Sequence, residues 1–312
     1  MNELAPDEIR RLISLAKRAL WSGLDVRAAL QSSGVNITPA NFYSSVPLLR
    51  DLDDSFEYAE EAAGVAPYAS TGLFDAARTA AFVESIAMYA DEFDPPMNGD
   101  PRDPSGFYWG NPAFSFMDAM SYYCILRTFR PTRVLEIGSG FSTLVADMAL
   151  RANGGGELVL IEPYPKPFLR KLTTVSRLIE QPVQSLSEKD VVSLVEQSQV
   201  WFIDSTHTVK SGSDCLYIYL KIMPKVRTSI LCHTHDVYLP YAMPPALARE
   251  KHVYWTEQYL LLAYLLDNPK AEVLMGSRYL QSRLPELSRS LMRGRYPGGG
   301  GSFWYRLGKP SG

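Results

Sequence analysis

Apolar residues recur at helical spacing along the first part of the chain. Residues 6–22 predict an amphipathic helix whose apolar stripe consists of Ile9, Leu12, Ile13, Ala16 and Leu20. Pro6 suits the first turn of this helix, and Gly23 ends it. Similar patterns predict further helices that end at Gly34 and span 53–63 and 73–90. We therefore expect residues 1–94 to form a helical N-terminal region.

Prolines and glycines interrupt the helical pattern at residues 94–106, which read DPPMNGDPRDPSG. Four prolines and two glycines in this short segment cannot sustain a helix or a strand. We therefore interpret residues 95–106 as a linker and place the domain boundary there.

Beyond the linker, uninterrupted apolar runs of strand length alternate with helical stretches. The seven runs are RVLEIG (133–138), ELVLIE (157–162), LIEQPV (178–183), VWFID (200–204), SILCHTHD (229–236), AEVLM (271–275) and SFWYR (302–306). Such an alternation is typical of a parallel sheet that is covered on both faces. Residues 107–312 are therefore predicted to form a doubly wound α/β domain with a seven-stranded, mostly parallel sheet. No clear helix separates the last two runs, which favours an antiparallel last strand.

The composition is that of a globular protein, because 46% of the 312 residues are hydrophobic and 21% are charged. The longest strongly apolar stretch, Leu260–Leu266, is too short to cross a bilayer, which needs about 20 residues. The acidic start of the chain is unlike a signal peptide. Three scattered cysteines, at positions 124, 215 and 232, favour a reducing compartment over a disulfide framework. We therefore expect a cytoplasmic protein without a transmembrane segment.

Charge is distributed unevenly, although the net charge is only −3. Residues 1–94 hold fifteen acidic and seven basic side chains, whereas residues 278–312 hold seven basic and one acidic. The basic end could bind an anionic partner such as a phosphorylated substrate, nucleic acid or a membrane surface. It could also pair with the acidic N-terminal part. We favour pairing, because no nucleic-acid-binding motif accompanies the arginines.

The strongest motif lies where the first predicted strand meets the next helix, at Val134–Thr143. There Gly138-Ser139-Gly140 permits a tight turn and lets a ligand approach the backbone. Glu136, in the preceding strand, would repel a pyrophosphate but suits a cationic amino-acid ligand. A plain strand–helix turn is the alternative interpretation of this loop.

Glu162 ends the second predicted strand, where a carboxylate can accept both hydroxyls of an adenosine ribose. With the acid and GxG loop before it, this pattern resembles that of class I S-adenosylmethionine-dependent methyltransferases. The resemblance covers about residues 107–306 and implies S-adenosylmethionine as the cofactor. It implies a cofactor site formed by Glu136, Gly138, Ser139, Gly140, Glu162 and Asp204.

Ionisable side chains also end the fourth and fifth predicted strands. Asp204 ends the fourth strand and His207 follows three residues later, while His235 and Asp236 end the fifth. Because parallel strands place their carboxyl ends at one edge, we expect these side chains to converge on a cleft for the acceptor. Asp204, His235 and Asp236 offer oxygen and nitrogen ligands for a divalent cation such as Mg²⁺. Alternatively, His233 or His235 is a core histidine and Asp236 caps a loop.

In metal-dependent O-methyltransferases of this fold, acids at these strand ends hold Mg²⁺ and a base lies three residues beyond the first acid. The resemblance therefore implies His207 as the general base, a role that imidazole performs near neutral pH. His235 departs from the usual acid or amide at its position, so metal binding and acceptor orientation by hydrogen bonds both stay open. Glu257, in the first turn of a later apolar helix, either faces the site or caps that helix.

These observations predict an S-adenosylmethionine-dependent O-methyltransferase that acts on a hydroxyl of a small polar acceptor, such as a sugar or a tailored metabolite. The segments NPAFS (111–115) and HTHD (233–236) resemble a bacterial branch of the superfamily associated with glycan or small-molecule tailoring. The predicted catalytic residues are His207, Asp204 and His235. N-methylation is an alternative, because a base near the acceptor serves either atom.

Two other classes of function were weighed. An NAD(P)-dependent oxidoreductase could use a similar sheet, but Glu136 and the Ser142 that replaces a third glycine argue against it. A non-catalytic scaffold could use the N-terminal helices for oligomerisation, but polar residues at three strand ends argue against that. In the enzyme, the same helices are expected to control acceptor access or to form a homo-oligomer.

Overall fold

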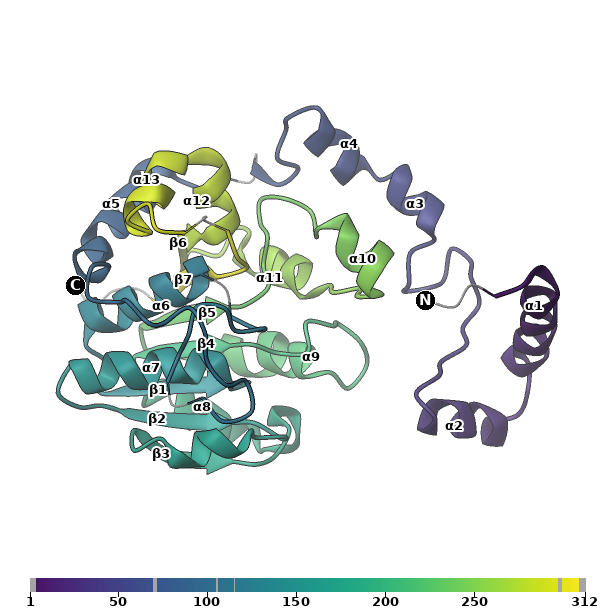
Figure 1. Cartoon of the computed structure of the whole chain (residues 1–312), viewed down its shortest axis with the longest axis horizontal. Helices are drawn as coiled ribbons and strands as arrows, with labels where there is room; N and C mark the ends of the chain where they lie inside the picture. Colours follow the sequence, from purple (N-terminus) through teal and green to yellow (C-terminus); the bar gives the residue numbers. More distant parts are fainter. Residues whose placement is uncertain (1–3, 70–71, 105, 115, 297–298, 309–312) are drawn as a thin grey trace. The chain divides into compact units, whose positions relative to one another are not determined.

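The protein is described by a computed structural model that covers residues 1–312, of which residues 1–3, 70–71, 105, 115, 297–298 and 309–312 are not described further. The chain divides into two compact units, Met1–Ser55 and Phe56–Gly312 (Figure 1). Each unit is considered by itself below.

The smaller unit contains three helices, α1 (Pro6–Leu20), α2 (Leu24–Ser32) and α3 (Leu49–Asp53). The predicted N-terminal helix is confirmed, and the Glu8 carboxylate accepts a hydrogen bond from the backbone N–H of Ala5 at 2.7 Å. Neither α1 nor α2 buries any of its residues. In the apolar stripe of α1, Ile9, Leu12 and Ile13 are therefore exposed, and Ala16 and Leu20 are only partly buried.

The larger unit begins with α4 (Phe56–Ala62) and α5 (Ala76–Ile86), followed by a 3-10 turn, η2 (Ala87–Tyr89). One side of α5 packs into the main hydrophobic core through Phe82, Val83 and Ile86. Because α5 belongs to this core, the larger unit begins earlier in the chain than the boundary that we predict at residues 95–106.

The proline-rich segment is itself part of the larger unit. The backbone N–H groups of Trp109 and Gly110 donate to the carbonyls of Pro96 and Met97, each at 2.8 Å. Trp109 is almost completely buried and packs against Phe93. The described part of residues 95–106 is thus a loop fixed to the core of this unit.

A seven-stranded sheet forms the centre of the larger unit, in the order β3-β2-β1-β4-β5-β7-β6. The strands are β1 (Arg133–Ile137), β2 (Glu157–Ile161), β3 (Val175–Ile179), β4 (Val200–Ile203), β5 (Ile230–Thr234), β6 (Ala271–Gly276) and β7 (Phe303–Leu307). Strands β1 to β5 pair in parallel, whereas β7 is antiparallel to both β5 and β6. The predicted fold class and the antiparallel last strand are confirmed.

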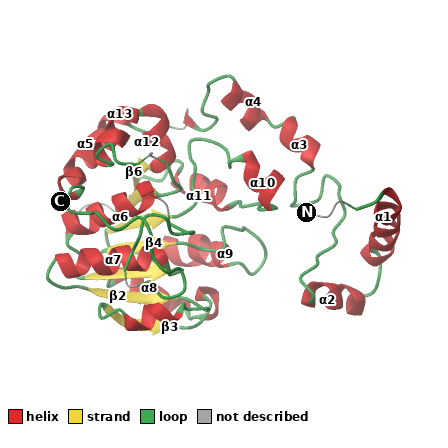
Figure 2. Cartoon of the chain, in the orientation of Figure 1, coloured by secondary structure: helices red, strands yellow, loops and turns green. Residues whose placement is uncertain are grey.

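Helices lie on both sides of the sheet (Figure 2). The helical segments between α5 and β4 are α6 (Phe116–Phe129), α7 (Phe141–Ala152), η3 (Pro167–Lys171), η4 (Val183–Ser185) and α8 (Glu188–Glu196), apart from η2. Those that follow β4 are α9 (Asp214–Tyr217), a π-helical segment η5 (Ile218–Ile222), η6 (Met223–Lys225), α10 (Pro245–Lys251), α11 (Glu257–Leu265), α12 (Ser277–Arg283) and α13 (Pro285–Leu291).

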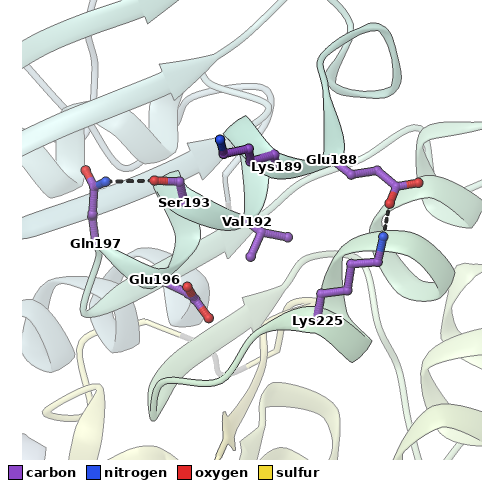
Figure 3. A pocket seen from close by; sticks show the side chains of 7 residues that line it. All are labelled: Glu188, Lys189, Val192, Ser193, Glu196, Gln197 and Lys225. Carbon is purple, nitrogen blue, oxygen red and sulfur yellow. Dashed lines mark hydrogen bonds and ion pairs between the residues drawn. The ribbon is translucent and has the colours of Figure 1, made fainter.

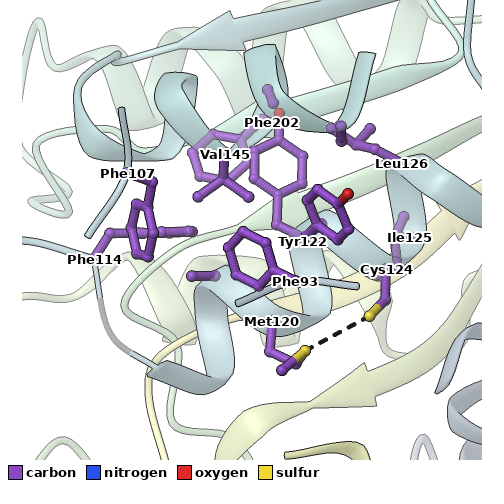
Figure 4. Close-up of a cluster of buried hydrophobic side chains, with 14 of the residues drawn as sticks. Phe93, Phe107, Phe114, Met120, Tyr122, Cys124, Ile125, Leu126, Val145 and Phe202 are labelled. Carbon is purple, nitrogen blue, oxygen red and sulfur yellow. Dashed lines mark hydrogen bonds between the residues drawn. The ribbon is translucent and has the colours of Figure 1, made fainter. Parts of the chain in front are cut away.

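Alternate residues of the central strands enter two separate hydrophobic cores. In β4, Phe202 belongs to the core that includes α6, whereas Trp201 and Ile203 belong to the core that includes α11. Figure 4 shows part of the first core, where Tyr122 of α6 stacks on Phe202 at a ring distance of 4.7 Å. Because both faces are covered, the ends of the strands are where polar side chains can reach a ligand.

Part of the basic C-terminal segment pairs with acids near residue 94, as we favoured from the sequence. Arg293 contacts Asp91 at 2.9 Å, and Arg295 contacts Asp94 at 2.8 Å. Arg306 pairs instead with Glu272 at 3.2 Å. No helix in the described part of the chain is long and apolar enough to span a membrane.

Candidate functional site

The Gly-Ser-Gly loop follows β1 and is held against both neighbouring strand ends. The backbone N–H of Gly138 donates to the carbonyl of Ile161 at 3.0 Å. Gly138 has a φ of +79°, and a Cβ atom there would lie 2.0 Å from the backbone oxygen of Asp204. A side chain at Gly138 would therefore collide with the end of β4, which explains why glycine is needed.

Ser139 and Gly140 leave one side of this loop open. A Cβ atom added to Gly140 would meet no atom within 4 Å, so a ligand can approach the backbone here. The Ser139 hydroxyl is buried and has no hydrogen-bond partner among the described residues. An unpaired buried hydroxyl next to open backbone fits a bound polar ligand, which supports the predicted cofactor loop.

Glu162 lies directly after β2 beside the same loop. Its carboxylate accepts hydrogen bonds from the backbone N–H groups of Ser139 at 3.1 Å and Tyr164 at 2.8 Å. The side chain is only partly buried. Because each carboxylate oxygen can accept more than one hydrogen bond, Glu162 keeps the capacity to accept from a ribose diol.

Glu136 is completely buried beneath the loop rather than exposed at its surface. Its carboxylate accepts hydrogen bonds from the hydroxyls of Tyr122 at 2.8 Å and Thr143 at 2.6 Å. Burial raises the pKa of Glu136 to about 7, although these two hydrogen bonds act in the opposite direction. Thr143 Oγ1 also accepts from the N–H of Gly140 at 3.1 Å, so Glu136 supports the loop from below through Thr143.

His207 lies between carboxylates that come from three different parts of the chain. Its Nε2 atom lies 3.1 Å from an oxygen of Asp204 and 3.6 Å from one of Asp236, and its Nδ1 atom lies 2.7 Å from one of Glu257. The side chain of His207 is buried, whereas that of Asp204 is about one-third exposed. The expected convergence of Asp204, His207 and Asp236 at the strand ends is thus present.

These carboxylates determine the protonation of the imidazole. Burial lowers the pKa of His207, but hydrogen bonds with Asp204 and Glu257 outweigh burial and raise it well above its ordinary value. Burial raises the pKa of Asp204, but contacts with His207 and His235 outweigh it, and that pKa is lowered. Both ring nitrogens thus face a carboxylate, Nε2 at 3.1 Å and Nδ1 at 2.7 Å, which favours the protonated imidazole.

The two histidines of β5 have different surroundings. His233 is completely buried and its Nε2 atom lies 2.8 Å from the hydroxyl of Ser302, so it is a core histidine. His235 packs against Phe114 at a ring distance of 5.2 Å, and its Nδ1 atom has no partner among the described residues. His235 therefore borders the site while its ring belongs largely to the core.

The predicted metal ligands do not form a metal site in this arrangement. The Nε2 atom of His235 lies 3.9 Å from a carboxylate oxygen of Asp236. The Nε2 atom of His207 lies close to the carboxylates of both Asp204 and Asp236. In the described part of the chain, no three His, Cys, Asp or Glu side chains are grouped so that they could hold a metal ion. The residues present therefore do not fit a metal centre, because an imidazole already contacts the two carboxylates.

Glu257 is the site residue whose role the sequence left open. It is 2% exposed and begins α11, fifty residues beyond His207. Its carboxylate also accepts hydrogen bonds from the hydroxyls of Ser205 and Tyr219, each at 2.8 Å. An acid at the start of an otherwise apolar helix was the only sequence signal for this residue.

A separate surface pocket lies along α8 and does not include these residues. It is lined by Glu188, Lys189, Val192, Ser193, Glu196, Gln197 and Lys225 (Figure 3). Glu188 forms an ion pair with Lys225 there. The pocket is therefore distinct from the candidate site at the carboxyl ends of the strands.

A family model matches the part of the chain that holds the loop and the strand-end residues of the candidate site. Residues 135–237 match the family model described as a methyltransferase domain. A curated relative, an uncharacterized protein of Archaeoglobus fulgidus, is 39% identical over 109 residues, which are 33% of this chain and 49% of the relative. The match thus spans about half the length of that relative.

Solved structures with similar folds include two methyltransferases. The O-methyltransferase TomG from Streptomyces achromogenes, in complex with SAM, has 13% sequence identity and a TM-score of 0.38, over 73% of this chain and 90% of TomG. The SAH-bound Podospora anserina methyltransferase PaMTH1 has 17% identity and a TM-score of 0.40, over 82% of this chain and 97% of PaMTH1.

The family match and the sheet order agree with the expectation from the sequence. The matched range begins in β1 and ends just after Asp236, so it includes the Gly-Ser-Gly loop, Glu162 and Asp204. Within the larger unit, residues 135–237 therefore resemble a methyltransferase domain.

Proposed function

We propose that the larger unit is a class I S-adenosylmethionine-dependent methyltransferase domain, which transfers a methyl group from this cofactor to a hydroxyl of a small polar acceptor. One observation carries the proposal: the open Gly-Ser-Gly loop and the Asp204–His207 pair meet at one edge of the sheet. The backbone of Asp204 lies so close to Gly138 that no side chain fits between them. A cofactor on the loop and an acceptor beside His207 would thus be neighbours.

The cofactor, when bound, supplies a methyl group activated by an adjacent sulfonium. For its ribose we assign Glu162, because this carboxylate is accessible and is held in place by two backbone N–H groups. For the amino-acid end we assign the backbone of Gly138 and Gly140 and the unpaired hydroxyl of Ser139. Glu136 acts from below by fixing the loop, since its own carboxylate is inaccessible.

His207 is the proposed general base, and Asp204, His235 and Asp236 are proposed to orient the acceptor. To accept the hydroxyl proton at Nε2, His207 must enter the reaction as neutral imidazole with its Nδ1 proton directed at Glu257. Asp204 at 3.1 Å and Asp236 at 3.6 Å from Nε2 favour the cationic form, so Asp204 must give way to the acceptor. The same arrangement could deprotonate a nitrogen acceptor, which makes N-methylation an outcome of the assay.

The acceptor is proposed to be a sugar or a tailored metabolite. Polar groups of Asp204 and Asp236 and the partly exposed ring of Trp255, 4.7 Å from that of His207, offer the hydrogen bonds and flat apolar contact that such molecules use. No step of the proposed reaction passes through a metal ion, because His207 already contacts both strand-end carboxylates.

The proposal is tested with methyl-transfer assays on a panel of sugars, phenols and amines. Replacing His207 with Ala should lower kcat by about 10²–10⁴-fold, the range typical of a lost general base, while cofactor affinity stays unchanged. His252→Ala is the matched control, since His252 is exposed at the end of α10. Full activity of the His207→Ala protein would exclude the base role. Loss of activity with a chelator, and its recovery with Mg²⁺ or Mn²⁺, would show that the reaction requires a metal ion.

A further inference from the structure

The carboxylate of Glu257 is directed away from its own helix. One of its oxygens lies 2.7 Å from His207 Nδ1 and 2.8 Å from the Ser205 hydroxyl, and the other accepts from Tyr219 at 2.8 Å. All these partners lie outside α11, so Glu257 does not cap that helix by hydrogen bonding. Within the described chain, His207 provides its only ion pair.

The backbones of the two segments are joined as well. The carbonyl oxygen of His207 accepts hydrogen bonds from the N–H groups of Thr256 at 2.8 Å and Glu257 at 3.1 Å. His207 has a φ of +57°, an unusual conformation for a residue with a side chain. Such strained residues persist where the surroundings hold them and are concentrated at functional sites. Here Glu257 holds both the backbone and the ring of His207.

A second layer of hydroxyl groups holds Glu257. Tyr219 comes from the π-helical segment η5, a rare conformation that is often found at functional sites. Its hydroxyl lies 3.2 Å from that of Thr234, which lies 3.2 Å from that of Tyr305. Tyr219, Thr234 and Tyr305 are completely buried. A carboxylate fixed by several buried donors can orient an imidazole with little loss of side-chain freedom.

We propose that Glu257 is the positioning residue for His207, fixing the proton on Nδ1 and directing Nε2 toward Asp204 and the acceptor. A carboxylate accepts hydrogen bonds but cannot donate them, so the nitrogen that faces it carries a proton. In the neutral imidazole the other nitrogen, Nε2, is then the one available for the acceptor, the same division of roles as in carboxylate–histidine pairs of hydrolases. Only the effect of Glu257 on catalysis rests on the proposed function, whereas its pairing with His207 does not.

The pairing is tested by ¹⁵N NMR of histidine side chains in the full-length protein. The chain has four histidines, so the His207→Ala spectrum identifies the His207 signals. In the wild type, Nδ1 of His207 should be protonated. Glu257→Gln should shift that signal. Tyr219→Phe removes one donor to the other carboxylate oxygen of Glu257 and leaves the contact with Nδ1 in place, so it should shift that signal less than Glu257→Gln does. A wild-type spectrum with an unprotonated Nδ1 would overturn the proposal even if no variant folds.

The kinetic consequence is measured with the same variants. Glu257→Gln should lower kcat about 10- to 100-fold, a loss typical of partners that orient a functional histidine, with the KM for S-adenosylmethionine unchanged. In the His207→Ala background the same substitution should have no further effect. Equal losses in both backgrounds would contradict positioning through His207. If the wild type methylates no acceptor, the proposed function fails, and the NMR result still decides the pairing.

Discussion

At the scale of single residues, three carboxylates near the carboxyl edge of the sheet differ in what surrounds them. Glu136 is completely buried under two hydroxyl donors, Glu162 is partly exposed beside two backbone donors, and Glu257 is buried against an imidazole. The same functional group is thus suited to support a loop, to bind a ligand or to orient a base. These differences lead to two predictions.

Glu136 should make the protein less stable as the pH rises. In the folded protein burial raises the pKa of this carboxyl to about 7, whereas the ordinary value is 4.5. Between those values the folded state binds the proton more tightly than the unfolded chain, so the free energy of unfolding falls with increasing pH. A difference of one pKa unit corresponds to about 1.4 kcal/mol, so the free energy of unfolding should decrease by roughly 3 kcal/mol in total between these two pH values.

Denaturant unfolding of the wild type and of Glu136→Gln, from below pH 4.5 to above pH 7, measures this contribution. The amide does not titrate, so the stability of the wild type relative to the variant should decrease across this range. The wild type and the variant share all other titrating groups, so the contributions of these groups cancel in the difference between the two free energies of unfolding. Parallel stability curves would show that Glu136 titrates normally in the folded protein.

Glu162 should contribute directly to cofactor affinity. Replacing it with Ala removes charge-assisted hydrogen bonds worth roughly 1.5–3 kcal/mol, so the Kd for S-adenosylmethionine should rise about tenfold to a hundredfold. Glu180→Ala is the control, because Glu180 is an exposed acid paired with Arg170. Calorimetry that finds unchanged affinity in folded Glu162→Ala would remove this residue from the cofactor site.

At the scale of elements, the two glycines of the β1–α7 loop have separable roles. Gly138→Ala forces a positive φ on alanine and a collision with the backbone of Asp204, so the free energy of unfolding should fall by at least about 1–3 kcal/mol. Gly140→Ala meets no neighbour, and its φ of 179° suits any residue. It should change stability by less than about 0.5 kcal/mol while weakening cofactor binding.

Thermal unfolding and calorimetry on both variants check this division. The expected result is a less stable Gly138→Ala protein and a stable Gly140→Ala protein with raised Kd for S-adenosylmethionine. Equal affinity of wild type and Gly140→Ala would mean that the cofactor does not approach the loop at this residue.

The sequence was sufficient to predict the central sheet, because its apolar runs and the intervening helices alternate regularly. It also located the loop and the strand-end acids, since each follows directly from a strand. It could not show that Glu257 faces His207, because fifty residues, which include β5 and several helical segments, separate them along the chain. Nor could it show that Glu136 is buried, because burial of a strand residue depends on which helices cover that face.

At the scale of the whole molecule, the division into units changes how the N-terminal region should be tested. The larger unit begins at Phe56, and α5 contributes Phe82, Val83 and Ile86 to its core. Removing residues 1–94 would therefore take away part of the core. A deletion that ends at Ser55 leaves α4, α5 and the sheet intact.

Deletion of residues 1–55 should leave cofactor binding measurable and change the mass in solution or the activity. The smaller unit buries nothing along α1 and α2, and it exposes large apolar side chains, among them Trp21 (81%), Phe42 (87%) and Tyr43 (84%). Exposed large apolar side chains form a site of association when they gather on one surface. We propose that this unit mediates self-association or controls acceptor access.

Light scattering and calorimetry on the full chain and on the two deletions separate these possibilities. The protein lacking residues 1–55 should fold and bind S-adenosylmethionine, whereas the protein lacking residues 1–94 should lose stability, because Phe82, Val83 and Ile86 are absent from its core. Fewer chains per particle for the shorter deletion than for the full chain indicate self-association through the N-terminal unit. An unchanged number of chains per particle with altered kcat or acceptor KM indicates control of access. An unchanged number of chains per particle and full activity would contradict both roles.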